Sequence, residues 1–161
     1  MRVGILGSGL MGGKLGTIFA RAGHEVVFSY AWSNDKLKKL ARDAQGNTRA
    51  GTTTSGAEEL AKKVPRAHVV LAFNTDPSEV LFGVFESKGK ETRPSLVYCG
   101  DDQGAKNVAA KLIHDAGFEP VDAGRLRIAR YTEPFALLAG ELAYRGDGGP
   151  ELAYRFERFR K

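Results

Sequence analysis

Six residues near the start of the chain have a spacing that suits the binding of a phosphate group. Glycine occupies the first, third and sixth positions of the segment Gly7, Ser8, Gly9, Leu10, Met11 and Gly12. Gly7 permits a tight turn, Gly9 has no Cβ to block a pyrophosphate, and Gly12 lets a helix pack close to a strand. The N–H groups and dipole at the start of such a helix attract phosphate charge. The motif therefore predicts a dinucleotide site, with a glycine turn that merely connects two elements as the alternative.

The residues that follow indicate which dinucleotide is favoured. In NAD-binding proteins with this motif, an acidic residue about 20 positions further on bonds to the ribose hydroxyls. No acidic residue lies between Phe28 and Asp35. The hydroxyls of Ser29 and Ser33 and the cation of Lys36 suit a 2′-phosphate instead, so we expect NADP(H) rather than NAD. The alternative for Lys36 is that it belongs to a solvated face of a helix.

Alternating strands and helices are predicted around these residues. Short apolar or β-branched runs predict strands, and apolar residues that recur every three or four positions predict helices. The expected strands cover residues 2–6, 25–30, 67–73, 95–99 and 118–121. The expected helices cover residues 10–22, 34–45, 55–64, 78–86 and 102–116, followed by one that starts at 132–134 with proline in its first turn and a short amphipathic one at 152–159. This order predicts an α/β fold, a Rossmann-like doubly wound parallel sheet of about five strands with C-terminal helices.

The same pattern suggests how the chain is divided and where one helix begins. Residues 46–57 contain no large apolar side chain, which indicates a surface loop. Ser55 followed by Glu58 three positions later has the spacing of a capping box, so we expect the next helix to start there. We expect residues 1–124 to form a shortened dinucleotide-binding domain. Residues 125–161 would form a helical extension that packs on the sheet or on a second copy of the chain.

The composition excludes several other classes of protein. With 161 residues, 42% hydrophobic and 27% charged, the chain should form a single globular domain rather than a disordered or membrane protein. The single Cys99 and three histidines offer no disulfide or metal framework, and they favour a reducing, cytoplasmic setting. The net charge of +5 is spread among acidic residues instead of forming a basic stripe, so nucleic acid is not an expected partner.

Four segments together resemble a known family of oxidoreductases. They are Met-Arg-Val-Gly-Ile-Leu-Gly-Ser-Gly-Leu-Met-Gly at the start, Phe-Ser-Tyr at 28–30, Ala-Phe-Asn-Thr at 72–75 and Tyr-Thr-Glu-Pro at 131–134. The chain resembles the NADPH-dependent reductases of the deazaflavin coenzyme F-420 and their dinucleotide-binding relatives. The resemblance implies direct hydride transfer between nicotinamide and deazaflavin, with no side-chain acid or base. The protein would then supply orientation and electrostatics.

The resemblance also implies roles for individual residues. The residues of the glycine motif would hold the pyrophosphate, and Ser29, Ser33 and Lys36 would surround the adenosine 2′-phosphate. Asn74 and Thr75 would line the redox cleft at the carboxyl end of a strand, where open parallel sheets bind their ligands. At Trp32 the family commonly has an arginine, so the preference for NADP is open at this position. The tryptophan would instead stack on the adenine.

The chain is shorter than the family pattern in one place. The resemblance implies that at least two strand–helix units, including the strand and loop that face the nicotinamide, are absent before the segment Thr-Ser-Gly-Ala-Glu-Glu-Leu. This implies an internal deletion after about Gly51. The strand beginning near Ala67 would then have to lie beside the first strand or pair with another molecule. We therefore expect a homodimer, either with or without exchange of elements between the two copies. The alternatives to an enzyme are a catalytically incomplete dinucleotide-binding module and a structural deletion variant.

Overall fold

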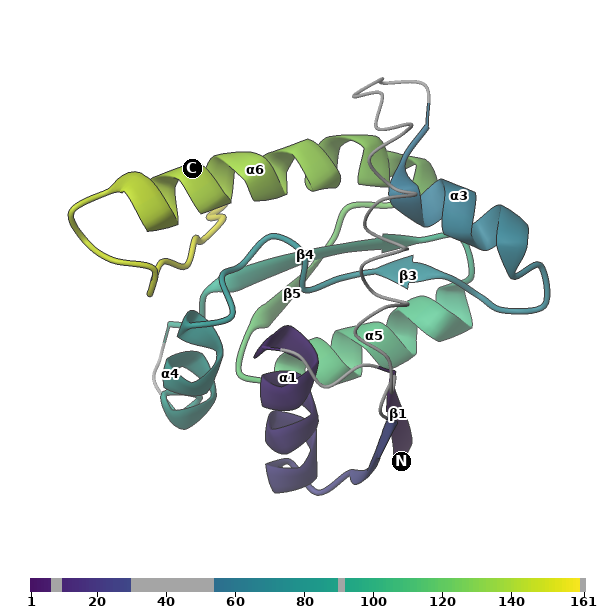
Figure 1. The fold of residues 1–161 in the computed structure, drawn as a ribbon, viewed down its shortest axis with the longest axis horizontal. Helices are drawn as coiled ribbons and strands as arrows, with labels where there is room; N and C mark the ends of the chain where they lie inside the picture. The colour runs from purple at the N-terminus through teal and green to yellow at the C-terminus, as the bar shows by residue number, and fades with distance from the viewer. Residues whose placement is uncertain (7–9, 30–53, 90–91, 160–161) are drawn as a thin grey trace, which may run out of the picture.

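The computed structural model describes residues 1–6, 10–29, 54–89 and 92–159 (Figure 1). The expectations for Gly7, Ser8, Gly9, Trp32, Ser33 and Lys36, and for the helix at 34–45, lie outside these residues. The proposed deletion after about Gly51 also falls outside them. Among the residues that are described, no helix has both the length and the apolar character needed to cross a membrane.

The N-terminal part forms the predicted strand–helix–strand unit. Strand β1 (Arg2–Leu6) leads to helix α1 (Leu10–Arg21), and strand β2 (Glu25–Ser29) returns parallel to β1. The pairing runs from Arg2 beside Glu25 to Leu6 beside Ser29, so both strands end at the same edge. Gly23, with φ +87°, follows the helix and ends it, because the left-handed conformation favours glycine.

A second sheet contains the remaining three strands in the order β3, β4, β5. Strand β4 (Ser95–Gly100) is buried along its whole length and pairs in parallel with β5 (Glu119–Asp122). Strand β3 (Val70–Leu71) pairs antiparallel with the end of β4, through Val70 beside Gly100 and Leu71 beside Cys99. The α/β class is confirmed, with parallel pairs at β1–β2 and β4–β5.

The expectation of a long parallel strand at residues 67–73 is wrong. Only two residues form a strand, and they pair with β4 of the same chain instead of with β1. The chain turns away at Phe73, whose φ of 61° is incompatible with an extended strand. The strand thus has a partner within its own chain, and the homodimer stays a prediction.

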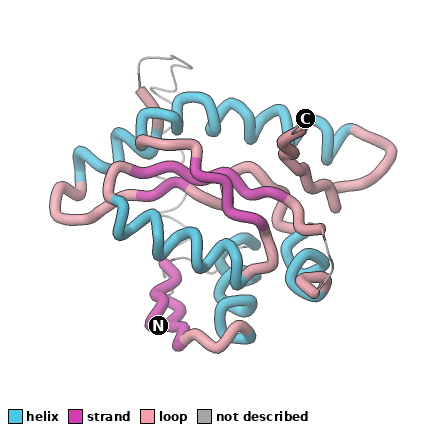
Figure 2. The backbone as a smooth tube through the Cα atoms, turned by 180° about the vertical axis from the view of Figure 1, so that it is seen from behind, coloured by secondary structure: helices cyan, strands magenta, loops and turns pink. Residues whose placement is uncertain are grey.

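Helices cover both faces of the three-stranded sheet (Figures 1 and 2). Helices α3 (Gly56–Lys63) and α6 (Ala129–Arg145) lie on one face, and α5 (Gln103–Asp115) lies on the other. The short α4 (Val80–Glu86) lies near one end of the sheet, with all four of its predicted apolar residues buried. The main core joins both sheets, because Ile18 and Phe19 of α1 pack in one cluster with Leu96 and Phe118.

Two expectations for the C-terminal part are corrected. Helix α6 begins at Ala129, because the 3-10 turn Leu126–Ile128 leads directly into it, so Pro134 lies inside the helix instead of in its first turn. The residues at 152–159 are not helical. They lie along β4, where the Ser95 N–H donates to the Tyr154 carbonyl at 2.8 Å and the Phe156 N–H donates to Ser95 Oγ at 2.9 Å. An amphipathic pattern alone does not reveal this competing use of the backbone.

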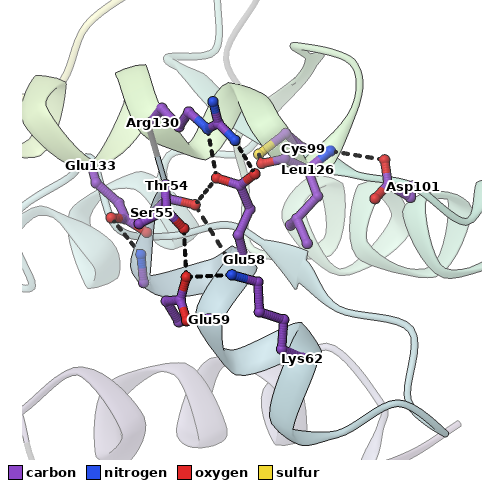
Figure 3. Close-up of polar contacts among 11 residues, drawn as sticks. Thr54, Ser55, Glu58, Glu59, Lys62, Cys99, Asp101, Leu126, Arg130 and Glu133 are labelled. Carbon is purple, nitrogen blue, oxygen red and sulfur yellow. Dashed lines mark hydrogen bonds and ion pairs between the residues drawn. The ribbon is translucent and has the colours of Figure 1, made fainter. Parts of the chain in front are cut away.

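Polar contacts attach α3 to α6 (Figure 3). The predicted helix start is confirmed, since Ser55 is the N-cap and its Oγ accepts from the Glu58 N–H at 3.2 Å. The Glu58 carboxylate bonds back to the Ser55 hydroxyl at 2.9 Å, which takes the place of the backbone bond of a full capping box. Arg130 donates to both carboxylate oxygens of Glu58, at 2.8 and 2.7 Å, and this bond lowers the pKa of Glu58 to about 2. The Glu133 carboxylate accepts from the N–H groups of Gly56 and Ala57. A negative charge therefore sits at the positive end of α3.

Gly117 provides a test of how β5 approaches α4. Its φ is +101°, and a Cβ there would lie 2.7 Å from the Val84 carbonyl oxygen. We expect Gly117→Ala to lower the free energy of unfolding by roughly 1–3 kcal/mol, because both the conformation and the contact are unfavourable. Gly83→Ala, in α4 with no atom within 4 Å of its Cβ, should be neutral or slightly stabilising. Urea unfolding followed by circular dichroism measures the stability of both variants. Equal stabilities would contradict the close approach of Gly117 to the Val84 carbonyl.

Candidate functional site

A pocket of about 280 Å³ lies where three parts of the chain meet. The start of α1 contributes Leu10 and Met11, and the loop after β3 contributes residues 74–78. Helix α6 forms the third wall through Ala136, Ala139, Gly140 and Tyr144. A pocket of about 330 Å³ lies between α4 and residues 92–94, but none of the predicted site residues lines it.

The pocket brings together four of the site residues predicted from the sequence, and these four come from two distant segments of the chain. Leu10 and Met11 of the glycine motif lie across it from Asn74 and Thr75. Gly12 lies in the first turn of α1 and does not line the pocket. Ser29 ends β2 beside Leu6, at the edge where β1 leads into the motif. The remaining nominated residues lie outside the described part of the chain.

Only one of the two polar atoms of the Asn74 amide has a hydrogen-bond partner among the described residues. Its Nδ2 donates to the Thr132 carbonyl of α6 at 3.0 Å. Its Oδ1 is buried and has no partner among the described residues. A buried amide oxygen without a partner is unfavourable, so an N–H group of a ligand in the pocket would be a suitable donor. Phe73, with its positive φ, turns the chain two residues after the end of β3, and Asn74 comes next.

Thr75 and Asp76 belong to a chain of hydrogen bonds that starts on β4. The Val97 N–H donates to the Tyr154 hydroxyl at 3.2 Å, and that hydroxyl lies 2.7 Å from Thr75 Oγ1. Thr75 Oγ1 donates to Asp76 Oδ2 at 3.2 Å. Because the Thr75 proton goes to Asp76, the Tyr154 hydroxyl must donate to Thr75. All the donors therefore point toward the Asp76 carboxyl.

Asp76 and Tyr154 were not predicted from the sequence to belong to the site. Asp76 is only 6% exposed, and burial raises its pKa to about 7, although the Thr75 bond acts in the opposite direction. Its position directly after Asn74 and Thr75 was a signal that could have drawn attention to it. Tyr154 gave no such signal, because it lay in a segment expected to be helical. It packs edge-on against Phe135 and Phe156, with ring centroids 5.1 and 5.3 Å apart.

Contacts at the rim hold the pocket walls in place. Lys14 Nζ of α1 donates to the Ser78 carbonyl at 2.9 Å, which ties the helix to the loop. The Tyr144 hydroxyl of α6 donates to Glu79 Oε2 at 2.9 Å. These contacts leave the start of α1 facing the pocket with its positive dipole end.

Other chemistry is not supported by the described residues. Among them, no group of three or more histidine, cysteine or acidic side chains could hold a metal ion. Cys99 is fully buried, and burial raises the pKa of its thiol to about 11. Such a thiol packs as a small apolar core residue.

The β1–α1–β2 unit and the helix-covered second sheet define a protein of the Rossmann-like α/β class. Residues 2–88, more than half of the chain, match the family described as NADP oxidoreductase, coenzyme F420-dependent. The chain belongs to this family, which confirms the resemblance drawn from the sequence.

Individual proteins resemble this chain in part of their sequence or in their fold. The chain is 32% identical to the metalloreductase STEAP3 of Rattus norvegicus over 83 residues, which are 52% of this chain and 16% of that protein. This chain therefore spans about a sixth of the length of that relative. A structure from Arthrobacter sp. FB24, proposed to be an F420-dependent NADP-reductase, matches with a TM-score of 0.74 and 18% identity over 96% of this chain and 98% of that one. The hypothetical protein SMa0349 of Sinorhizobium meliloti matches with a TM-score of 0.60, 21% identity and coverages of 96% and 95%.

Tyr154→Phe should test the hydrogen-bond chain. Without its hydroxyl, the N–H of buried Val97 loses its acceptor and Thr75 loses its donor. We expect the free energy of unfolding to fall by about 1–3 kcal/mol. Tyr144→Phe removes a hydroxyl that contacts Glu79 at the surface, so its effect should stay within about 0.5 kcal/mol. If urea unfolding gives both variants the same stability, the buried chain of bonds does not stabilise the fold.

Proposed function

We propose that this protein binds NADP(H) and passes hydride between its nicotinamide and a deazaflavin-type partner. The observation that carries the proposal is the pocket itself, which joins the start of α1 to Asn74 and Thr75. Family membership supports NADP as the nucleotide and coenzyme F420 as the class of partner. The deazaflavin-type partner is proposed from this membership.

The described residues fit one end of such a cofactor. A volume of about 280 Å³ is at the small end of ligand pockets, and it suits one ring with its amide better than a whole dinucleotide. The unpartnered Oδ1 of Asn74 would accept from the carboxamide N–H of nicotinamide. Alanine and glycine on α6 leave room for a flat ring against the helix.

The remaining nominated residues would hold the other parts of the cofactor. Residues 7–12 would hold the pyrophosphate at the start of α1, in keeping with its dipole. Ser29, Ser33 and Lys36 would contact the 2′-phosphate, and Trp32 would stack on the adenine. When bound, nicotinamide supplies the hydride chemistry. The protein orients the ring, keeps water out of the pocket and fixes the distance to the second substrate.

A second candidate is a module that binds NADP(H) without catalysing its oxidation. The observation that favours it is the short β3, which has two residues where the sequence predicted seven. A shortened sheet offers less surface at its carboxyl edge for a second substrate. The glycine motif and the pocket would still bind the nucleotide.

Fluorescence of Trp32, the single tryptophan, distinguishes these candidates. We expect NADPH to change the fluorescence at lower concentration than NADH or ADP, and F420 to be reduced when NADPH is present. Binding without F420 or dye reduction would favour the non-catalytic module. No change at millimolar nucleotide would contradict both candidates.

The variant Gly9→Asp tests the glycine motif in the same titration. An added carboxylate in the turn would repel the pyrophosphate, so we expect nucleotide binding to be lost while the far-UV spectrum stays unchanged. Gly148→Asp, at an exposed position with no atom within 4 Å of its Cβ, is the matched control and should bind normally. Unchanged affinity of Gly9→Asp would overturn the phosphate assignment.

We also propose that two copies associate through α6. This helix exposes several large apolar side chains, namely Tyr131 (63% exposed), Leu137 (74%), Leu138 (54%) and Leu142 (60%). Exposed apolar surface of this extent on one helix is typical of an interface.

Sedimentation at micromolar concentration should give twice the mass of the chain. Leu138→Asp with Leu142→Asp should give monomers, whereas Val108→Asp, on exposed α5 surface, should not. A monomeric native protein would end this proposal.

A further inference from the structure

The Asp76 carboxyl is a pocket group that the proposed hydride transfer does not use. It lines the pocket, and its side chain is more than nine-tenths buried. Oδ2 accepts from Thr75, while Oδ1 has no hydrogen-bond partner in the described part of the chain. No ion pair involving Asp76 is formed by the described residues. A buried carboxyl without a cation is neutral unless a ligand supplies the positive charge.

We propose, building on the proposed function, that Asp76 distinguishes oxidised from reduced cofactor by exchanging a proton. The oxidised nicotinamide ring is a cation, and the reduced ring is neutral. When NADP⁺ enters, the protonated Asp76 carboxyl gives up its proton to solvent, and the resulting carboxylate pairs with the ring. When NADPH enters, no cation is present and the carboxyl keeps its proton. Each NADP⁺ that binds to a molecule with protonated Asp76 releases one proton, and no bond to the ring is formed or broken.

The hydrogen-bond chain from β4 suits this role. Thr75 donates to Asp76 Oδ2 and itself receives from Tyr154. These oriented donors stabilise the ionised carboxylate once a cation is present. Oδ1 remains available to the ligand. The carboxyl is therefore held in position while its charge can change.

Other titratable groups around the pocket have partners of their own. On α1, Lys14 bonds to the Ser78 carbonyl. Before α4, Glu79 accepts from Ser78 and from Tyr144 of α6, and these bonds help keep its pKa below the usual value. In the C-terminal segment, burial raises the pKa of Tyr154, so this group stays neutral near pH 7. Asp76 is the described pocket group that changes charge in the neutral range.

The direction of the pH dependence follows from the free and bound states. Burial raises the pKa of Asp76 to about 7 in the unliganded protein. A neighbouring cation lowers that pKa in the complex. NADP⁺ therefore binds more tightly as pH rises, by about tenfold between pH 6 and pH 8 if the bound carboxyl stays ionised throughout. The affinity for NADPH should not rise with pH as a result of Asp76 ionisation.

Calorimetric titration at pH 6.5, in two buffers that differ in ionisation enthalpy, measures the protons released. We expect NADP⁺ to release about 0.8 proton more than NADPH, as a group with a pKa near 7 requires. Both nucleotides carry the same 2′-phosphate, so the difference between them removes its contribution. This comparison uses the unmodified protein and does not depend on any variant.

Two variants assign the proton to Asp76. Asp76→Asn should abolish the difference in proton release and flatten the pH dependence of NADP⁺ affinity. Glu86→Gln, which removes an acid from the exposed surface of α4, should leave both unchanged. If NADP⁺ and NADPH bind with equal proton release, the inference is wrong although the proposed function stands. If neither nucleotide binds, both are wrong.

Discussion

Strand β4 is buried along its whole length, so each of its backbone N–H groups needs an acceptor inside the protein. Strand β3 reaches only Cys99 and Gly100, which leaves the same edge open at Ser95 and Val97. Tyr154 closes that edge twice, with its carbonyl for Ser95 and its hydroxyl for Val97. The same hydroxyl holds Thr75, which in turn bonds to Asp76. The geometry of the pocket wall therefore depends on completing the hydrogen bonds of one strand.

Much of the fold was predictable because its signals are local. The helix start at Ser55 and Glu58, the glycine end of α1 and the apolar face of α4 all follow from residues within one or two turns of each other. The errors involve contacts between distant segments. The reversal of β3 depends on Phe73, a residue type that rarely adopts a positive φ. The extended course of residues 151–159 depends on open donors of β4, more than 50 residues away in the sequence.

The candidate site divides along the same line. Leu10 and Met11 were predicted from the glycine motif. Asn74 and Thr75 were predicted because the segment at 72–75 resembles the same segment of the family. Asp76 could be identified as a site residue only once its burial was known, because an acidic residue after a strand is usually solvated. Helix α6 contributes mostly small residues to the pocket, and small residues in a sequence give no functional signal. The structure adds the third wall and the buried carboxyl to the two segments that the sequence had nominated.

The attachment of the C-terminal segment also bears on how the protein avoids self-association through its sheet. An open edge on a buried strand is a template for pairing with strands of other molecules, and proteins commonly cover such edges. Here the cover is a single non-helical segment, held largely by Tyr154 and Phe156. Proteolytic clipping in the loop after α6 would leave the helices intact but uncover Ser95 and Val97. Aggregation would then begin from a molecule that is still mostly folded.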